Sequence, residues 1–250
     1  MVLKGKTIIV TGASSGIGAA AAKLFAAEGA NLVLGARRKD RLKDIADDIN
    51  QSMGAAVFLA GDVGDESYAS SLVALAEDRF GGLDAAFNNA GIIGEMGSVP
   101  DMPDDNWQTV IQTNLTSGFY AAKQQIPALK KNGGGSLVFT SSFVGHTIGL
   151  PGMAAYAASK AGLIGMVQVL AVEHGADNIR VNSVLPGGTR TEMAGDDPQA
   201  HEWISGLHAL KRMAEPEEIA CAALFLVSDQ SSFMSGSAMI VDGGNSINKT

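Results

Sequence analysis

Near its amino terminus the chain reads Thr7-Ile8-Ile9-Val10-Thr11-Gly12-Ala13-Ser14-Ser15-Gly16-Ile17-Gly18, an apolar run that leads into a turn of small residues. The apolar run predicts a buried strand, and the residues after it have the period of a helix. The three glycines would permit a sharp turn, a close approach of phosphates to the backbone, and tight packing of helix on strand. The stretch therefore predicts a phosphate-binding turn at a helix amino terminus, with a purely structural turn as the alternative.

The same alternation continues along the chain. Short apolar runs predict strands at residues 7–10, 31–34, 56–59, 83–87, 136–139, 179–184 and 238–241. Stretches of helical period lie between them, at residues 18–28, 38–52, 66–80, 107–131, 153–175 and 216–229. Such alternation is typical of a doubly wound α/β fold, a parallel sheet with helices on both faces. With no linker or repeat in the pattern, residues 1–250 are expected to form one domain with a sheet of about seven strands.

One interval breaks this rhythm, between the sixth predicted strand and the helix that begins near Pro216. It is rich in Gly, Thr, Asp and Met, and it follows the carboxyl end of a strand, where open α/β sheets bind ligands. A long insertion at this edge predicts a substrate lid at about residues 187–214. The alternative is an ordinary surface loop.

Composition excludes several other classes of protein. Of the 250 residues, 46% are hydrophobic and 18% are charged, which argues against disorder. The net charge of −8 disfavours nucleic acid as a partner, because phosphates select a basic surface. The single cysteine, Cys221, excludes a disulfide framework and fits a cytoplasmic protein best. No apolar run reaches the roughly 20 residues of a membrane span, and no secretory segment is expected at the amino terminus.

The end of the second predicted strand indicates which dinucleotide would bind. In dinucleotide-binding folds a carboxylate near this point holds the ribose hydroxyls of NAD, whereas an arginine accommodates the 2′-phosphate of NADP. Here the strand ends in Arg37 and Arg38, without Asp or Glu. Cations are poorly placed at a helix amino terminus unless an anion binds there. The pair predicts NADP(H) in preference to NAD(H), which stays the alternative cofactor.

Polar residues at two further strand ends are candidates for ligand contact. Asp62, next to Val63, could accept a hydrogen bond from the adenine amine or simply cap the following helix. The fifth predicted strand ends in Thr140, Ser141 and Ser142, any of which could hydrogen-bond a carbonyl oxygen or serve only in a turn. Spacing alone does not choose among these three.

A tyrosine and a lysine four residues apart are the leading candidates for catalysis. Tyr156 and Lys160 would lie on one face of a helix. A phenol with a pKa near 10 is a poor proton carrier at neutral pH, and a neighbouring ammonium would bring that pKa closer to the working range. Such a pair could protonate a ketone as hydride arrives, or deprotonate an alcohol.

Taken in order, these features resemble the short-chain dehydrogenase/reductase family in its single-domain form. The matching segments are Thr11-Gly12-Ala13-Ser14-Ser15-Gly16-Ile17-Gly18, Asn88-Asn89-Ala90-Gly91, Asn114, Ser142, Tyr156 with Lys160, Pro186-Gly187 and Val241-Asp242-Gly243-Gly244. They are collinear over nearly the whole chain. The resemblance implies a Rossmann-type sheet, a nicotinamide cofactor, and hydride transfer between a ketone or aldehyde and a secondary alcohol.

The resemblance also implies a role for each site residue. Tyr156 would donate or accept the proton, and Lys160 would lower the pKa of Tyr156 and hold the nicotinamide ribose. Ser142 would orient the carbonyl, and Asn114 would support a water chain to Lys160. The cofactor would contact both Tyr156 and Lys160, together with Gly12, Ser14, Ser15, Gly16, Ile17, Gly18, Arg37, Arg38, Asp62, Val63, Asn89, Ala90, Gly91, Pro186, Gly187, Thr189 and Thr191.

Two departures from the family pattern bear on these expectations. Ser142 precedes Tyr156 by 14 positions, one more than is common in the family. Ser15 stands where some NADP-dependent relatives carry a lysine or arginine. The NADP(H) prediction therefore depends mainly on Arg37, with Arg38 second.

The substrate is expected to be a small carbonyl or alcohol compound. The residues expected around it are mixed to apolar: Phe143, His146, Ile148, Met153, Met193, His201 and Trp203. The alternative is a 3-oxoacyl thioester on an acidic acyl carrier protein, which would require basic residues beside the active-site mouth. Acidic residues are expected there instead, with Lys130 and Lys131 as exceptions: Glu173, Asp177, Glu192, Asp196 and Asp197.

Other classes of function fit less well. A nucleotide-sensing protein without catalysis is disfavoured by the complete set of Asn114, Ser142, Tyr156 and Lys160. The histidines lack ligand spacing joined to acidic partners, so no metal site is expected. The family resemblance implies a homotetramer formed through the two long helices at 107–131 and 153–175.

Overall fold

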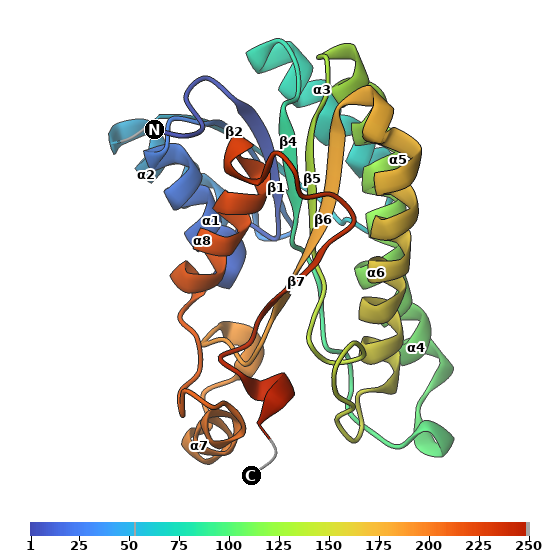
Figure 1. Ribbon diagram of the computed structural model, residues 1–250. Helices are drawn as coiled ribbons and strands as arrows, with labels where there is room; N and C mark the ends of the chain where they lie inside the picture. The colour runs from blue at the N-terminus through green and yellow to red at the C-terminus, as the bar shows by residue number, and fades with distance from the viewer. Residues whose placement is uncertain (53, 249–250) are drawn as a thin grey trace.

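A computed structural model describes residues 1–52 and 54–248, and Figure 1 shows its layers. The strands are β1 (Thr7–Thr11), β2 (Asn31–Ala36), β3 (Ala55–Ala60), β4 (Ala85–Asn88), β5 (Gly135–Thr140), β6 (Ile179–Pro186) and β7 (Ala238–Val241). They form one parallel sheet in the order β3-β2-β1-β4-β5-β6-β7. The predicted doubly wound, Rossmann-type sheet is confirmed.

Helices cover both faces of this sheet. One face carries α1 (Gly16–Ala27), α2 (Lys39–Ser52) and α8 (Pro216–Val227). The other carries α3 (Glu66–Phe80), α5 (Ser117–Lys131) and α6 (Ala154–His174), and α4 (Asp104–Ile111) packs against α6. The remaining helix, α7 (Pro198–Leu207), lies beyond the carboxyl ends of the strands. Short turns complete the chain: η1 (Val99–Asp101), η2 (Gln112–Thr116), η3 (Gly175–Asp177), η4 (Glu192–Ala194), η5 (Asp229–Ser231) and η6 (Asn245–Ile247).

The continuous apolar strands follow from burial on both faces. In β1, Ile8 and Val10 belong to the core beneath α1 and α8, while Ile9 belongs to the core beneath α3, α5 and α6. Successive side chains of a strand point to opposite faces, so a strand covered on both sides is apolar at every position. This is the pattern from which the strands were predicted.

The predicted helix over 107–131 is wrong in two respects. The structure begins it earlier, at Asp104, where Pro103 precedes two acidic residues in the first turn of α4. Both features favour a helix amino terminus. The structure also inserts the π-helical turn η2, Gln112–Thr116, between α4 and α5. A π turn adds one residue without a change in composition, so sequence periodicity does not reveal it.

Residues 187–214 form an excursion whose two ends are joined. The amide of Ala214 donates to the carbonyl of Gly188 over 2.9 Å, and the amide of Arg190 donates to the carbonyl of Ala214 over 2.8 Å. The segment between them contains η4 and α7, and the Asp197 side chain caps α7 by accepting from the amide of Gln199. The excursion is thus a closed loop at the carboxyl edge of the sheet. It is called the lid below after the role expected from the sequence, which stays a prediction.

By length and composition alone, Ala154–Asp177 could cross a membrane, with a mean hydropathy of 1.4. The sequence contains no continuous apolar run there, because Lys160, Gln168 and Glu173 interrupt it. In the structure this segment is α6 followed by η3, and α6 packs along β6 and against α4. Its apolar composition is that of a helix in a protein core.

Candidate active site

The carboxyl edges of β1 and β4 form the crevice where the site is built. The chain leaves β1 through α1 on one face and leaves β4 toward α4 on the other, so the two connections diverge at this point. The loop after β4 is tied back to β1: the amides of Asn89 and Ala90 donate to Thr11 Oγ1 over 3.0 and 3.3 Å. Asn89 also accepts from Thr140 Oγ1 at the end of β5, over 3.1 Å.

The glycine turn leaves room for a ligand against the amino terminus of α1. Gly12 and Gly16 have φ of +68° and +51°, in the left-handed region. A Cβ on Gly18 would lie 2.2 Å from the carbonyl oxygen of Gly12, so the first turn of α1 lies too close to the glycine turn for any side chain at that position. Ser15 makes no side-chain cap on α1, and no acidic residue stands in its first turn. The amides of this turn therefore fit a diphosphate.

Arg38, and not Arg37, lies over this turn. Its Nε and Nη2 donate to Ser14 Oγ over 3.1 and 3.0 Å, and Nη2 also donates to Ser15 Oγ. Arg37 is exposed, and its side chain makes no hydrogen bond or ion pair within the described part of the chain. In the protein alone Arg38 thus contacts the turn and Arg37 does not, and the expected order of the two as phosphate ligands, Arg37 before Arg38, stays a prediction. Consecutive residues leaving a strand point to opposite sides, and the sequence does not show which side faces the turn.

Asp62 and Val63 follow β3 at the same edge. The Asp62 carboxylate is exposed and accepts from the amide of Gly64 over 2.8 Å, which is the turn-closing role considered for it. Val63 lines the small cavity described below. The contact of Asp62 with adenine stays a prediction.

Lys160 is the most deeply buried cation of the site. It lies in the second turn of α6, with only 3% of its surface exposed, and its Nζ donates to the carbonyl of Thr140 over 2.7 Å. The same Nζ is 5.6 Å from the centre of the Tyr156 ring. Helical spacing thus brings the two residues together, as the sequence predicted.

The pKa values of this pair differ from the expectation. Burial lowers the pKa of Lys160 to about 8. Burial raises the pKa of Tyr156, and only its interaction with the Ser142 side chain opposes this rise. Desolvation of the phenolate therefore sets the direction of the shift in the protein alone, and the lowering expected from Lys160 is not seen there.

The three hydroxyl residues after β5 have different surroundings. Thr140 accepts from Lys160 through its carbonyl, and Ser141 donates to the carbonyl of Lys160 over 2.7 Å. Ser142 accepts from the amide of Val144 over 3.1 Å and interacts with Tyr156. Ser142 is therefore the one beside the phenol, whereas Thr140 and Ser141 anchor α6 on the sheet.

Asn114 fixes the loop after β4 against two helices. Its Oδ1 accepts from the amide of Ile92 over 2.8 Å, and its Nδ2 donates to the carbonyl of Ile92 and to Ser159 Oγ over 2.9 and 3.0 Å. A Cβ on Gly91 would lie 3.1 Å from Asn114 Oδ1 and 3.2 Å from Lys160 Nζ. A side chain at position 91 would therefore be tight against these two groups, and one of them would have to shift. Ser159 was not identified from the sequence, although it lies one helical turn after Tyr156.

The entrance of the lid is packed on a buried histidine that the sequence did not indicate. Gly188 donates its amide to His208 Nε2 over 3.0 Å, and a Cβ on Gly187 would lie 2.9 Å from that nitrogen. Pro186 is the last residue of β6. Thr189 is buried, and its hydroxyl donates a hydrogen bond to the carbonyl of Gly187. Further along, the Thr191 methyl group would be 3.0 Å from a Cβ on Gly16, so the lid reaches the glycine turn.

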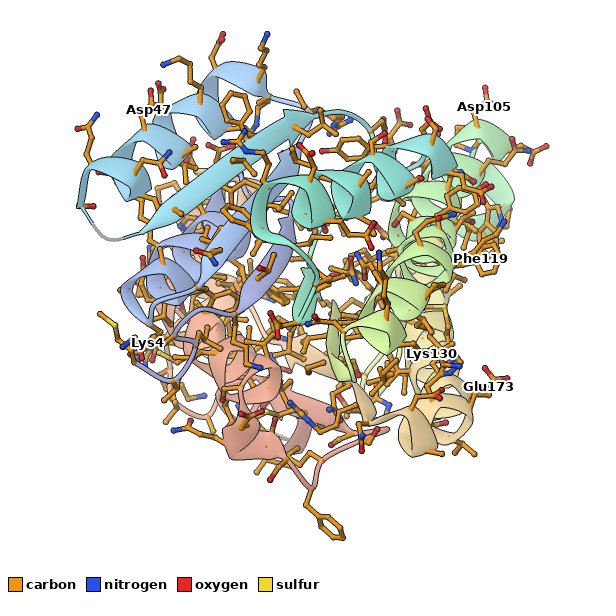
Figure 2. The ribbon with its side chains drawn as sticks, turned by 90° about the horizontal axis from the view of Figure 1, so that it is seen from above. Lys4, Asp47, Asp105, Phe119, Lys130 and Glu173 are labelled. Carbon is orange, nitrogen blue, oxygen red and sulfur yellow. The ribbon has the colours of Figure 1, made fainter. Side chains whose placement is uncertain are left out.

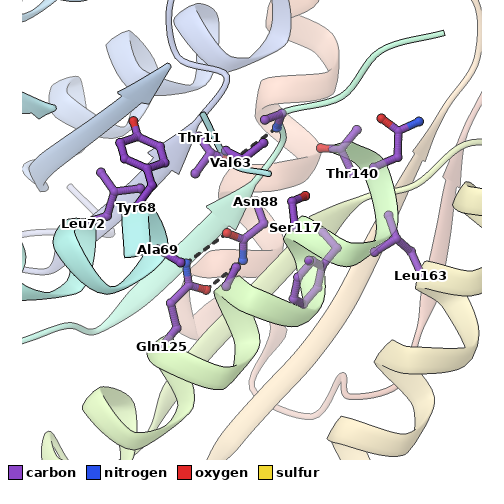
Figure 3. Close-up of a pocket in the computed structure, with 15 residues that line it drawn as sticks. Thr11, Val63, Tyr68, Ala69, Leu72, Asn88, Ser117, Gln125, Thr140 and Leu163 are labelled. Carbon is purple, nitrogen blue, oxygen red and sulfur yellow. Dashed lines mark hydrogen bonds between the residues drawn. The ribbon is translucent and has the colours of Figure 1, made fainter. Parts of the chain in front are cut away.

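A small cavity lies behind the site, beneath α5 (Figure 3). It is bordered by Asn114 and Thr140, and at its far side Asn88 and Gln125 exchange two hydrogen bonds of 2.8 and 3.0 Å. These amides are satisfied by each other, so the pair links β4 to α5. In residues 1–52 and 54–248, no group of three or more His, Cys, Asp or Glu side chains could hold a metal ion.

The residues expected around the substrate have mixed surroundings. Phe143 is buried in the protein core, and His146 is exposed. His201 Nε2 lies 2.8 Å from the carbonyl oxygen of Gly195, within the lid. The partly or largely exposed apolar members are Ile148, Met153, Met193 and Trp203.

Four of the charged residues expected at the active-site mouth lie at the opposite end of the molecule. Because α5 and α6 run against the strands, their carboxyl ends reach the amino edge of the sheet, which Figure 2 views from above. Glu173 is roughly 25 Å along α6 from Tyr156. Lys130 pairs there with Asp177 over 2.8 Å, and Lys131 pairs with Glu77 over 2.9 Å. Of the expected set, the lid holds only Glu192, Asp196 and Asp197.

Comparison with known proteins agrees with this geometry. The family model described as enoyl-(acyl carrier protein) reductase matches residues 12–246. The crystal structure of a short-chain type dehydrogenase/reductase from Mycobacterium marinum superposes with a TM-score of 0.94 at 35% identity, over 98% of this chain and 97% of that one. The chain belongs to the short-chain dehydrogenase/reductase family. It is therefore an oxidoreductase that acts on an alcohol or carbonyl group with a nicotinamide cofactor.

Two relatives represent the range of substrates in this family. The A-factor type gamma-butyrolactone 1′-reductase (1S-forming) of Streptomyces virginiae is 37% identical, over 98% of this chain and 97% of the relative. The 3-oxoacyl-[acyl-carrier-protein] reductase of Chlamydia muridarum (strain MoPn / Nigg) is 40% identical, over 97% of this chain and 98% of the relative. Family membership thus fixes the reaction type and leaves the substrate open.

The buried ammonium leads to a test by stability. Lys160→Met removes a charge that burial disfavours, at the cost of the hydrogen bond to Thr140. Without cofactor at pH 7, we expect the variant to gain about 1–2 kcal/mol in free energy of unfolding. The gain should be complete below pH 8, where the folded wild type is protonated, and should disappear toward pH 10.5, where both folded and unfolded lysines are neutral. Urea unfolding at pH 7 and 10 measures it, and a loss of stability at pH 7 would contradict the burial cost.

Proposed function

We propose that this protein is an NADP(H)-dependent oxidoreductase that interconverts a free ketone or aldehyde and a secondary alcohol. The observation that supports it best is that Tyr156, Lys160 and Ser142 lie together at the carboxyl end of β5, next to the loop after β4. In the reducing direction the carbonyl carbon receives a hydride and the carbonyl oxygen receives a proton; oxidation reverses both transfers. The cofactor, when bound, supplies or accepts the hydride.

In this proposal Tyr156 is the proton donor and Ser142 orients the substrate. The phenol is protonated at neutral pH because burial raises its pKa, so it is ready to donate to a carbonyl oxygen as negative charge develops there. The Ser142 hydroxyl, next to the phenol, donates a hydrogen bond to the same oxygen. Alcohol oxidation needs the phenolate instead, and a nearby positive charge favours that form.

In this proposal Lys160 holds the cofactor ribose and supports proton return to the phenol of Tyr156. Its ammonium has three donors, and the Thr140 carbonyl accepts one of them. The other two N–H donors remain for the cofactor ribose and for a water that returns a proton to Tyr156 after each transfer. Asn114 uses its side-chain amide on Ile92 and Ser159, so it positions the loop and leaves only its backbone for the water chain.

The cofactor is proposed to lie across the crevice from α2 to α6. Gly12, Gly16 and Ile17, with the hydroxyls of Ser14 and Ser15, would hold the diphosphate at the amino terminus of α1. Asn89, Ala90 and Gly91 would line the path to the nicotinamide, with Pro186, Gly187, Thr189 and Thr191 on the lid side. Arg38 would hold the 2′-phosphate, with Arg37 beside it, and Asp62 and Val63 would meet the adenine.

A free substrate is favoured over a thioester on a carrier protein by the charges of the lid. Arg190 pairs with Glu215 over 3.2 Å, and Arg212 forms two hydrogen bonds of 2.6 Å with Glu218. These two cations are already neutralised, and Lys211, which donates to the carbonyl of Gly206, is the one lysine or arginine among the described lid residues without an acidic partner. Little positive surface is left for an acidic carrier. The 3-oxoacyl thioester remains the second candidate because of the 40% identical relative.

A cytoplasmic homotetramer formed through α5 and α6 is proposed as the assembly. Apolar side chains on these two helices face solvent, with 52% of Phe119, 56% of Val169 and 85% of Val172 exposed. Burial of such a patch against a second copy would remove it from water. Light scattering at micromolar concentration should give four times the mass of the 25.7 kDa chain, and a monomer would refute the assembly.

The first catalytic test is the removal of one oxygen atom. Tyr156→Phe should abolish NADPH-dependent reduction while it leaves the dissociation constant of NADPH within about twofold, because the ring stays and the proton donor goes. Turnover should be measured with a panel of cyclic and acyclic ketones, sugars and acetoacetyl thioesters. Undiminished turnover in the variant would refute the role of Tyr156, and faster wild-type turnover of the thioesters than of every free ketone would establish the second candidate.

The cofactor preference is tested by two neighbouring substitutions. Arg38→Gln should lower kcat/KM for NADPH by about 10- to 100-fold, the value of a hydrogen bond to a charged group, with little change for NADH. Arg37→Gln, the matched control, should have a smaller effect. A larger effect of Arg37→Gln would return the phosphate contact to that residue, and no effect of either would contradict the preference for NADPH.

A further inference from the structure

A single carboxylate of the lid bridges two arginines across the cofactor crevice. Glu192 Oε2 accepts from Arg38 Nη1 over 2.6 Å, and its Oε1 accepts from Arg41 Nη1. Arg38 follows β2 and Arg41 lies in the first turn of α2, whereas Glu192 begins η4 in the lid. Segments far apart in the sequence are thus held together by one side chain.

This bridge is accessible to ligands and solvent. Glu192 lines a cleft with Gly16, Lys23 and Thr191 that opens between the lid and α1. The side chain of Glu192 is 54% exposed, and those of Arg38 and Arg41 are 43% and 50% exposed. Exposed ion pairs contribute little stability each, so an anion that binds the same arginines can replace the carboxylate.

The donors of Arg38 are nearly all in use. Its Nε and Nη2 donate to the hydroxyls of Ser14 and Ser15, and its Nη1 donates to the Glu192 carboxylate. Glu192 is its only negatively charged partner among the described residues. A phosphate that approached this guanidinium would be repelled by the carboxylate and would lack a free pair of donors. The two anions therefore compete for one site.

We propose that Glu192 is an internal competitor for the 2′-phosphate of NADP(H), so that binding of the phosphorylated cofactor releases the lid from α2. NAD(H), which lacks this phosphate, leaves the carboxylate on Arg38 and Arg41 and the lid attached. The proposal rests on the proposed NADP(H) dependence and adds a residue that sets its strength. Since Arg38 and Arg41 hold the pKa of Glu192 below its ordinary value, the carboxylate stays charged through the neutral range.

The competition is measured with two small probes that differ by one phosphate. Calorimetry should compare adenosine 2′,5′-bisphosphate with 5′-AMP on the wild type and on Glu192→Gln. We expect the variant to bind the bisphosphate about fivefold more tightly at low salt, with 5′-AMP unchanged and the difference smaller at high salt. Glu202→Gln, on α7 of the same lid, removes the same charge away from the arginines and should leave both affinities unchanged.

The lid is followed by the fluorescence of Trp203, the lid tryptophan, in a Trp107→Phe background. The bisphosphate should shift the emission of the protein with Glu192, whereas Glu192→Gln should show the shifted emission without ligand. 5′-AMP should shift neither protein.

The outcomes separate this proposal from the one on which it rests. If wild type and Glu192→Gln both prefer the bisphosphate over 5′-AMP by the same factor, the competition is refuted and the NADP(H) preference stands. If neither prefers the bisphosphate, both proposals fail. Weaker binding of the bisphosphate to Glu192→Gln would show that the carboxylate supports the site, which also overturns the competition.

Discussion

The burial of one lysine ammonium is the constraint on which the site depends. Lys160 donates to the carbonyl of Thr140, the last residue of β5. The start of α6 at Ala154 places its second turn, which contains Lys160, within hydrogen-bonding distance of that carbonyl. Ser141 completes the attachment through the carbonyl of Lys160 itself. Gly91 leaves room for the ammonium, because a Cβ at that position would lie only 3.2 Å from Lys160 Nζ. The ammonium is thus kept in a buried position, where the Thr140 carbonyl accepts one of its three N–H donors and two donors remain for other acceptors.

Much of the fold could be predicted from the sequence, since parallel strands buried on both faces are apolar throughout and the glycine turn has few alternatives. Tyr156 and Lys160 could be paired by helical spacing. Three features of the site could not be predicted from the sequence and became visible only in the structure. Side-chain direction after β2 put Arg38 over the turn, burial raised the pKa of Tyr156, and the direction of α6 carried Glu173 away from the site. Each depends on orientation in space, which spacing along the chain does not contain.

The two sides of the crevice are built differently. On the catalytic side the contacts are buried and short, between Lys160, Thr140 and Asn114, and little there can move without loss of hydrogen bonds. On the adenosine side the contacts of Arg38 and Glu192 are exposed and ionic. In the proposed function, an exchangeable ionic contact beside a rigid reaction centre would let the lid respond to the cofactor without disturbing Tyr156.

Transfer of a labelled hydride tests the central claim most directly. Wild-type protein should be incubated with a ketone that it reduces and with NADPH deuterated at one face of nicotinamide C4, in ordinary water. We expect mass spectrometry to find deuterium on the new carbinol carbon for one of the two labelled faces and not for the other. An alcohol product without deuterium from either form would contradict hydride transfer from a cofactor bound beside Tyr156.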